Sequence, residues 1–156
     1  AEGQIVGTAL ANSLRKGGFR ILTKPVPADD FLAEIKRPDN PWDLYPDHWA
    51  PDWPSGAAVL PALYDGRAIK PTGGNNGTSY LDARPLDADF DRILAMPLDA
   101  QGPEWATLDE RIMREYAPTV PLYVELTCTV RGPRLGGLFV DGVFGSPAFV
   151  NAFVRP

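Results

Sequence analysis

The sequence has a single cysteine and no long apolar run, and both shortages exclude classes of protein. Cys128 alone can form no disulfide within the chain and cannot supply the repeated cysteine spacing of a zinc site. Because a lone cysteine inside an apolar run is usually a small packing residue, we expect Cys128 to be buried. No segment approaches the roughly 18 consecutive apolar residues that a membrane-spanning helix requires. The first residues, Ala1 and Glu2, are not followed by the apolar stretch of a signal peptide.

Positive charge and catalytic motifs are scarce as well. Fifteen lysine and arginine residues against 20 aspartate and glutamate residues give a net charge of −5. This balance argues against nucleic acid or an anionic membrane surface as the main partner. The sequence has no nucleophile elbow, zinc-protease helix motif, phosphate-binding loop or dinucleotide-binding fingerprint. No motif therefore indicates catalysis, and we expect no enzyme activity, catalytic residue, metal or cofactor.

The chain is long enough for one domain and rich in turn residues. Its 156 residues suffice for a hydrophobic core and are few for two domains. Seventeen prolines and 15 glycines imply long connections with many turns. The chain begins within a predicted helix that has no capping residue before it, so we expect a segment of a longer protein.

Five segments have the apolar spacing or the end signals of helices, and they cover residues 4–16, 27–38, 57–64, 86–95 and 103–117. The clearest apolar faces are Leu86, Phe90, Ile93 and Leu94 in the fourth segment and Trp105, Leu108, Ile112 and Tyr116 in the fifth. On the fifth helix, Glu110 and Arg114 have the spacing of an ion pair. On the fourth, we expect the aspartates at positions 87, 89 and 91 to be solvated surface residues.

Three further segments, residues 19–23, 42–45 and 122–130, have the residue types and alternation of β-strands. Helices that alternate with strands are typical of α/β folds with a largely parallel sheet. The glycine-rich tail that follows has aromatic residues with few neighbours to cover them. We expect Phe139, Phe144, Phe149 and Phe153 to be partly exposed, packed on one another, or buried in a partner.

Residues 41–54, PWDLYPDHWAPDWP, form the most unusual segment. They contain three of the four tryptophans, the only histidine, four prolines and three aspartates. A tryptophan face attracts apolar groups and cations, and a carboxylate forms a charge-assisted hydrogen bond with an amine. The segment therefore suits a ligand with an apolar body and a cationic end. The structural alternative is that these tryptophans pack under a long loop.

Other functions remain open for the same segment. Trp42, Trp49 and Trp53 could stack on sugar rings if they formed one exposed platform, as in a surface carbohydrate-binding module. His48 with Asp43, Asp47 and Asp52 could hold a metal, although this spacing matches no specific class of site. The same three aspartates could supply the acid pair of a hydrolase.

The order of segments resembles the C-terminal part of family 5 extracellular solute-binding proteins, the peptide receptors of ABC importers. The first matching run is ALANSLRKGGFRILTKPVPADDF, and the second is the element Trp49-Ala50-Pro51-Asp52-Trp53. A loop and helix, NNGTSYLDARPLDADFDRIL, come next. The last match consists of Glu115, Ala117, Pro118, Pro121, Leu122 and Tyr123. Where the family often has an acidic residue and proline after its aspartate element, this chain has Trp53-Pro54-Ser55-Gly56.

The resemblance implies one lobe of a type II periplasmic-binding-protein-like fold, with a mixed, mostly parallel sheet flanked by helices. Residues 1–120 would form the C-terminal α/β lobe, and residues 121–156 a strand and return segment that contacts the first lobe. Asp52 matches the aspartate that holds a peptide's N-terminal ammonium, and Trp49 and Trp53 would flank it in the cleft. The implied partners are a peptide or small solute and the permease subunits of the importer. The implied location is extracellular or periplasmic, with a lipid anchor outside this segment.

Overall fold

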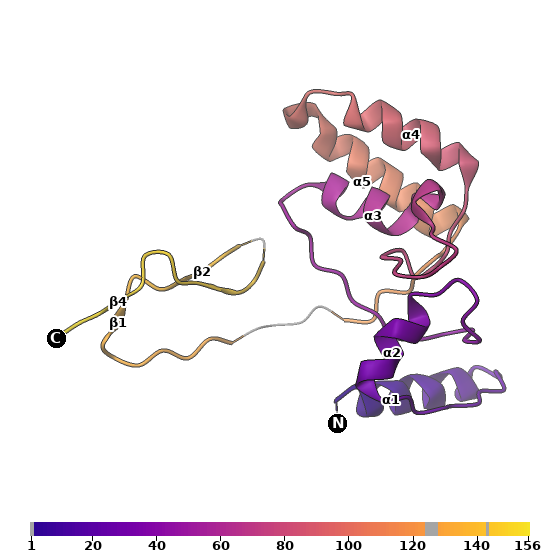
Figure 1. Cartoon of the computed structure of the whole chain (residues 1–156), viewed down its shortest axis with the longest axis horizontal. Helices are drawn as coiled ribbons and strands as arrows, with labels where there is room; N and C mark the ends of the chain where they lie inside the picture. Colours follow the sequence, from indigo (N-terminus) through magenta and orange to yellow (C-terminus); the bar gives the residue numbers. More distant parts are fainter. Residues whose placement is uncertain (1, 124–127, 143) are drawn as a thin grey trace.

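The computed structural model describes residues 2–123, 128–142 and 144–156, and it forms a small α/β domain. Its helices are α1 (Glu2–Lys16), α2 (Ala28–Ile35), α3 (Leu60–Tyr64), α4 (Arg84–Leu94) and α5 (Leu98–Glu115). Two short 3-10 turns, η1 (Gly56–Ala58) and η2 (Gly66–Ala68), flank α3. The strands are β1 (Leu135–Gly136), β2 (Phe139–Val140), β3 (Pro147–Ala148) and β4 (Phe153–Val154). Figure 1 shows α3, α4 and α5 packed together, with α1 and α2 to one side.

The five predicted helices are confirmed, with several changes of boundary. α2 ends at Ile35 and not near residue 38, and α3 begins at Leu60, after η1, and not at residue 57. α5 begins at Leu98, so Pro103 lies inside the helix rather than at its start. Pro61 lies in the first turn of α3, where its missing N–H leaves no helix bond unmade. The predicted pair between Glu110 and Arg114 forms at 2.8 Å on the outer face of α5.

The hydrophobic core lies between α3, α4 and α5. Its buried members are Leu60, Tyr64, Ala83, Leu86, Phe90, Ile93, Trp105, Leu108 and Ile112. The rings of Phe90 and Trp105 pack in a tilted arrangement with their centroids 6.5 Å apart. Leu94, expected on the same face of α4, is 48% exposed because it lies at the edge of that face. The core therefore depends on the two helices whose apolar spacing was clearest in the sequence.

The acidic residues of α4 are paired and not simply solvated, which corrects the sequence interpretation. Arg67 contacts Asp91 through two hydrogen bonds of 3.0 Å and reaches Asp87 at 3.8 Å. Asp89 accepts a short hydrogen bond from Arg111 of α5. These ion pairs link α4 to η2 and to α5 on the outer side of the core.

The predicted parallel sheet does not occur among the described residues. Residues 19–23 and 42–45 form no strand, and neither do residues 122, 123 and 128–130, while residues 124–127 lie outside the described part. The strand pairs found are antiparallel, β1 with β4 and β2 with β3. Alternating apolar residues indicate an extended backbone, but a strand also needs a neighbour that accepts and donates its hydrogen bonds. The described residues of these segments alternate in the sequence, but no described segment pairs with them.

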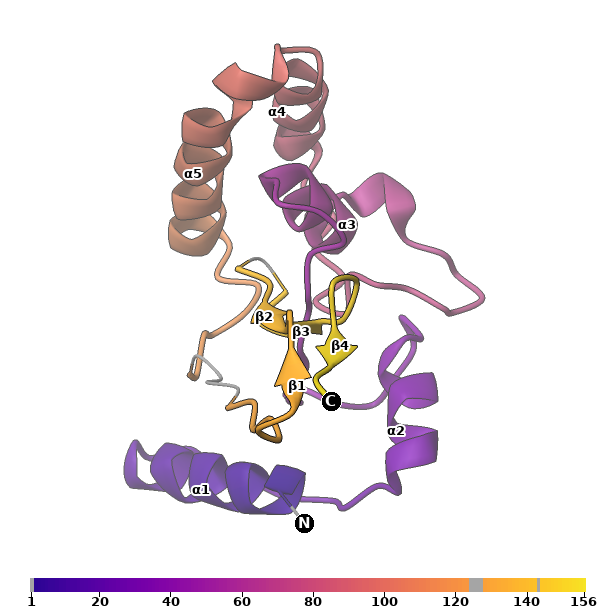
Figure 2. The same cartoon turned by 90° about the vertical axis from the view of Figure 1, so that its left-hand side faces the viewer.

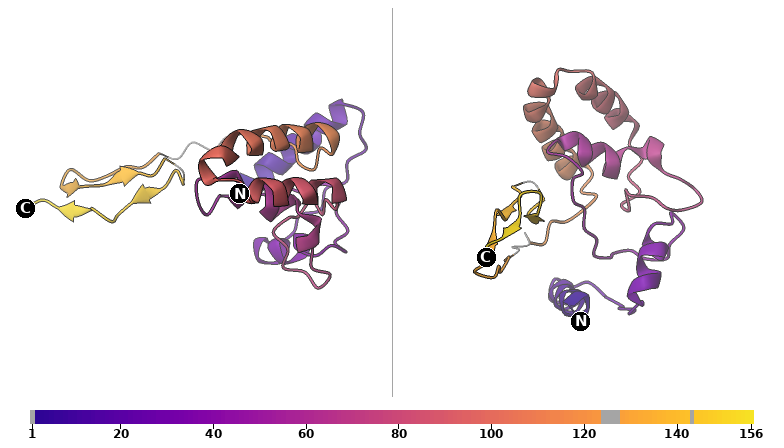
Figure 3. Two further views of the ribbon diagram at one scale, coloured as in Figure 1. Left: turned by 90° about the horizontal axis from the view of Figure 1, so that it is seen from above. Right: turned by 60° about the vertical axis from the view of Figure 1, so that its left-hand side comes forward.

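The four short strands form an arm that stands apart from the helices, as Figures 1 and 3 show; Figure 2 looks along this arm. Its phenylalanines, Phe139, Phe144, Phe149 and Phe153, are 46% to 66% exposed, so their expected exposure is confirmed. Cys128, which we expected to be buried, is also exposed. The sequence could not show this, because an apolar run buries its residues only where another surface covers it. No helix in the described part of the chain combines the length and the apolarity that crossing a membrane demands.

Candidate functional site

The tryptophan-rich segment, residues 41–54, runs without regular structure from the end of α2 towards η1. Two of its tryptophans are half-buried and tied to different elements. The indole N–H of Trp42 donates to Glu34 Oε2 of α2 at 3.0 Å, and that of Trp49 donates to the carbonyl of Ala58 in η1 at 2.9 Å. Trp53 is 50% exposed. The three indoles therefore do not form the fully exposed platform that a carbohydrate-binding module would need.

Asp52 and Trp53 lie at the surface, and Trp49 precedes them as a partly covered anchor. Asp52 makes no ion pair with any described residue, so its carboxylate faces solvent without a cationic partner from this chain. The structure thus places an exposed carboxylate next in sequence to an exposed indole. The role of these three residues in ligand binding stays a prediction.

A link between two loops was not foreseen from the sequence. The hydroxyl of Thr78 donates to Asp47 Oδ2 at 2.6 Å, and the hydroxyl of Tyr45 donates a short bond to the carbonyl of Thr78. We call Tyr45, Asp47 and Thr78 the Thr78 latch. Burial, and then the charge of Asp47, raise the pKa of the Tyr45 hydroxyl, so it remains a donor at neutral pH. The latch holds the tryptophan-rich segment against the loop that precedes α4.

The latch also corrects the alternative roles suggested for Asp47. Its second carboxylate oxygen accepts from the backbone N–H of His48 at 2.8 Å, so both oxygens are engaged within the chain. Throughout residues 2–123, 128–142 and 144–156, no group of three or more histidine, cysteine, aspartate or glutamate side chains could hold a metal ion. No spacing signal could have revealed the latch, because its members are 31 and 33 residues apart.

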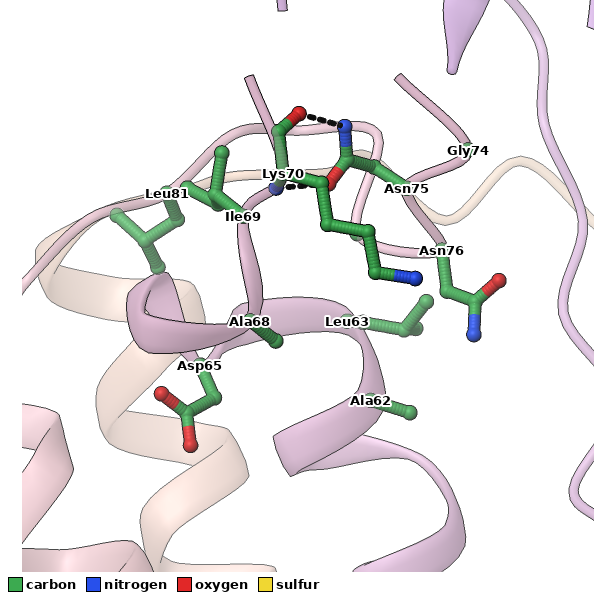
Figure 4. A pocket seen from close by; sticks show the side chains of 11 residues that line it. Ala62, Leu63, Asp65, Ala68, Ile69, Lys70, Gly74, Asn75, Asn76 and Leu81 are labelled. Carbon is green, nitrogen blue, oxygen red and sulfur yellow. Dashed lines mark hydrogen bonds between the residues drawn. The ribbon is translucent and has the colours of Figure 1, made fainter. Parts of the chain in front are cut away.

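The loop from Lys70 to Tyr80 is held by the buried side chain of Asn75, and Figure 4 shows two of its hydrogen bonds. The Asn75 amide donates to the carbonyls of Lys36 and Lys70 at 3.0 Å each and accepts from the N–H of Lys70 at 2.7 Å. The Tyr80 hydroxyl donates to the carbonyl of Ile35 at 2.6 Å. Two polar side chains thus fasten this loop to the end of α2, without any strand pairing.

A hollow of about 150 Å³ lies beside this loop. It is lined by Ala62, Leu63, Asp65, Ala68, Ile69, Lys70, Gly74, Asn75, Asn76, Gly77 and Leu81. Its volume is below the roughly 300–1,000 Å³ of typical small-molecule sites. The hydrogen-bonding groups of Asn75 are engaged by backbone, and Asp65 is paired with Arg67 at 2.8 Å. The hollow is therefore a packing feature of the loop and a poorer candidate than the surface around Asp52.

The comparison with solved structures gives one clear likeness. The protein named "Clavulanic acid biosynthesis oligopeptide binding protein 2" superposes with a TM-score of 0.88 over 98% of this chain, at 25% sequence identity. The match spans 29% of that protein's chain, so this sequence corresponds to less than a third of its length. No protein-family model matches the sequence, and no curated protein matches it. The chain thus shares its fold with a segment of an oligopeptide-binding protein.

Proposed function

We propose that this chain is part of a receptor that captures a peptide or a similar small solute outside the membrane for an ABC importer. The observation that carries the proposal is the superposition of nearly the whole chain on part of an oligopeptide-binding protein. That relative is named as a binding protein, which favours binding over catalysis for this chain. The permease subunits of the importer would be its protein partners, and a lipid anchor would hold the receptor at the membrane.

Asp52 is the anchor for the ammonium of the solute in this proposal. Its exposed carboxylate has no partner cation in the described residues, and Trp53 beside it offers an apolar face that also attracts cations. A charge-assisted hydrogen bond from an ammonium to this carboxylate fixes one end of the solute. The flanking indoles then cover its apolar groups.

Residues 1–120 act as one lobe, and residues 121–156 form the return segment that contacts a second lobe. The exposed phenylalanines of the β arm support this division, because apolar surface of this kind is normally covered. In a receptor whose second lobe encloses the solute, the contact between ammonium and carboxylate is removed from water. Breaking such a buried charge pair costs roughly 2–5 kcal/mol of binding free energy.

The test uses the indole N–H signals of the four tryptophans in a nuclear magnetic resonance titration of this chain. Trialanine with a free amino terminus is compared with N-acetylated trialanine, which has the same shape near the backbone but no ammonium. We expect the Trp53 and Trp49 signals to move with the free peptide, while Trp105, buried and bonded to Gln101, stays in place. Because the lone lobe leaves the carboxylate in water, an exposed pair contributes about 0.2–1 kcal/mol, which gives only about a 1.4- to fivefold preference for the free peptide.

Asp52→Asn is the decisive variant, since it keeps the shape of the side chain and removes its charge. Asp43→Asn is the matched control, being an exposed aspartate in the same segment. Loss of the preference for the free peptide in Asp52→Asn but not in Asp43→Asn supports the anchor. Equal shifts with both peptides, or an unchanged preference in Asp52→Asn, would contradict it.

A further inference from the structure

In this structure the ammonium group of Lys24 lies over the ring of Trp42. The ammonium of Lys24 lies 4.8 Å from the centroid of the Trp42 ring, inside the roughly 6 Å range of a cation–π contact. The ring is fixed by its indole N–H, which donates to Glu34, and by its backbone N–H, which donates to Asn40 Oδ1 at 3.1 Å. Lys24 itself is exposed and lies on the segment without regular structure between α1 and α2. A fixed aromatic face is thus covered by a charged side chain from a neighbouring segment.

The surroundings of the ring favour a positive charge. Glu34 accepts from the indole edge through Oε2, so a carboxylate adds its negative potential to that of the aromatic face. A hollow of about 240 Å³ borders Glu34 and is also lined by Arg37, Asp39, Asn40 and Pro41. Arg37 and Asp39 pair with each other at 2.7 Å, whereas Glu34 makes no ion pair within the described part of the chain. Within the described residues, the hollow therefore contains one carboxylate that makes no ion pair.

We propose that the face of Trp42 and the carboxylate of Glu34 form a binding site for an alkylammonium group, and that Lys24 fills it when no ligand is bound. The site uses α2 and the start of the tryptophan-rich segment, and it shares no residue with the surface around Asp52. It does not depend on the proposed receptor function. The ligand chemistry is an ammonium on an alkyl group, either a quaternary ammonium or the side chain of a lysine.

Because Lys24 belongs to the same chain as the site, its competition with an added ligand can be estimated. Lys24 competes with any added cation. The ligand concentration at half-saturation is therefore raised by a factor of one plus the ratio of molecules with Lys24 on the Trp42 ring to molecules with Lys24 off it. An exposed cation–π contact contributes about 0.5–1 kcal/mol, which corresponds to a ratio of about two to five. Replacing Lys24 by methionine keeps an apolar stem of similar length and removes the competing charge. We expect the half-saturating concentration to fall about three- to sixfold in Lys24→Met.

The experiment follows the Trp42 indole N–H signal during titration with tetramethylammonium chloride, with sodium chloride at equal ionic strength as the reference. A second titration uses Nα-acetyl-lysine amide, and its neutral analogue Nα-acetyl-norleucine amide shows any effect of the alkyl chain alone. The Trp105 signal reports whether each variant keeps its core. Lys24→Gln serves as a second uncharged variant if Lys24→Met does not fold.

The site is supported if the Trp42 signal moves saturably with either cation and if the half-saturating concentration is lower in the Lys24 variant. The ranking of the two cations then shows whether it prefers a quaternary or a primary ammonium. Glu34→Gln retains an acceptor for the indole and removes the charge, so binding should weaken while the Trp42 signal stays near its original position. Movement equal to that in sodium chloride, or a half-saturating concentration that is the same with and without Lys24, would overturn the proposal.

Discussion

Removing the hydroxyl of Thr78 should loosen the tryptophan-rich segment and lower the stability of the chain by a measurable amount. Thr78→Val keeps the branched shape and deletes the donor of the 2.6 Å bond to Asp47. Hydrogen bonds to charged groups contribute about 1.5–3 kcal/mol, but Asp47 is exposed and regains water when the bond is lost. Thr78 itself is 9% exposed, so the new methyl group fits a largely covered place. We therefore expect a loss of about 1–2 kcal/mol in the free energy of unfolding.

The assay is urea unfolding followed by tryptophan fluorescence, with the free energy obtained by linear extrapolation. A double-mutant cycle with Asp47→Ala, which removes the acceptor, separates the bond from other effects of each substitution, and we expect a coupling energy of about 1 kcal/mol. Thr72→Val is the matched control, because Thr72 is an exposed threonine of the same loop. A coupling energy within about 0.3 kcal/mol of zero would show that the latch does not stabilise the two loops. Thr78→Val should also shift the Trp49 indole signal, whereas Thr72→Val should not.

Three further outcomes are expected. Phe90→Ala removes a fully buried ring of the core and should lower the free energy of unfolding by about 3–5 kcal/mol in urea titrations; a loss below 1 kcal/mol would contradict the assigned core. Gly77→Ala places a methyl group 2.3 Å from the carbonyl oxygen of Leu63, so it should cost about 1–3 kcal/mol, and a neutral effect would mean that the loop does not approach α3 so closely. The hydrogen bond from Arg67 lowers the pKa of Asp65 below its usual 3.8, so the pair stabilises the fold above about pH 4 and is lost as acid titrates the folded carboxyl. Asp65→Asn should therefore cost about 0.2–1 kcal/mol at pH 7 and almost nothing at pH 2; a cost that does not change with pH would exclude the ion pair as its source.

The helices were predictable because their signals are local. Apolar residues at helical spacing in α4 and α5 identify the faces that meet in the core, and Phe90 and Ile112 are fully buried as that spacing implies. Prolines and glycines mark most of the ends. Pro103 is the exception, since one missing hydrogen bond near the start of a long helix is tolerated.

The strands and the latch were not predictable because both depend on distant partners. Residues 19–23 alternate like a strand, yet no described segment pairs with them. Asp47 was considered as a metal ligand or catalytic acid because carboxylates serve in both, but Thr78 engages it from 31 residues away. Asp52 and Trp53 were singled out through the element Trp49-Ala50-Pro51-Asp52-Trp53; both lie at the surface, and their role in binding stays a prediction.

The uneven distribution of the core implies two levels of stability in one chain. The core cluster runs from Leu60 to Ile112, whereas the described side chains from 4 to 54 include only two buried ones, Ala11 and Ile35. Segments with few buried contacts open at lower free energy than the rest of a protein. Amide hydrogens of α1 should therefore exchange with solvent long before those of α4 and α5. A protease should cut the segment between α1 and α2 while the core remains folded, so partial digestion would leave a resistant fragment built on α3, α4 and α5.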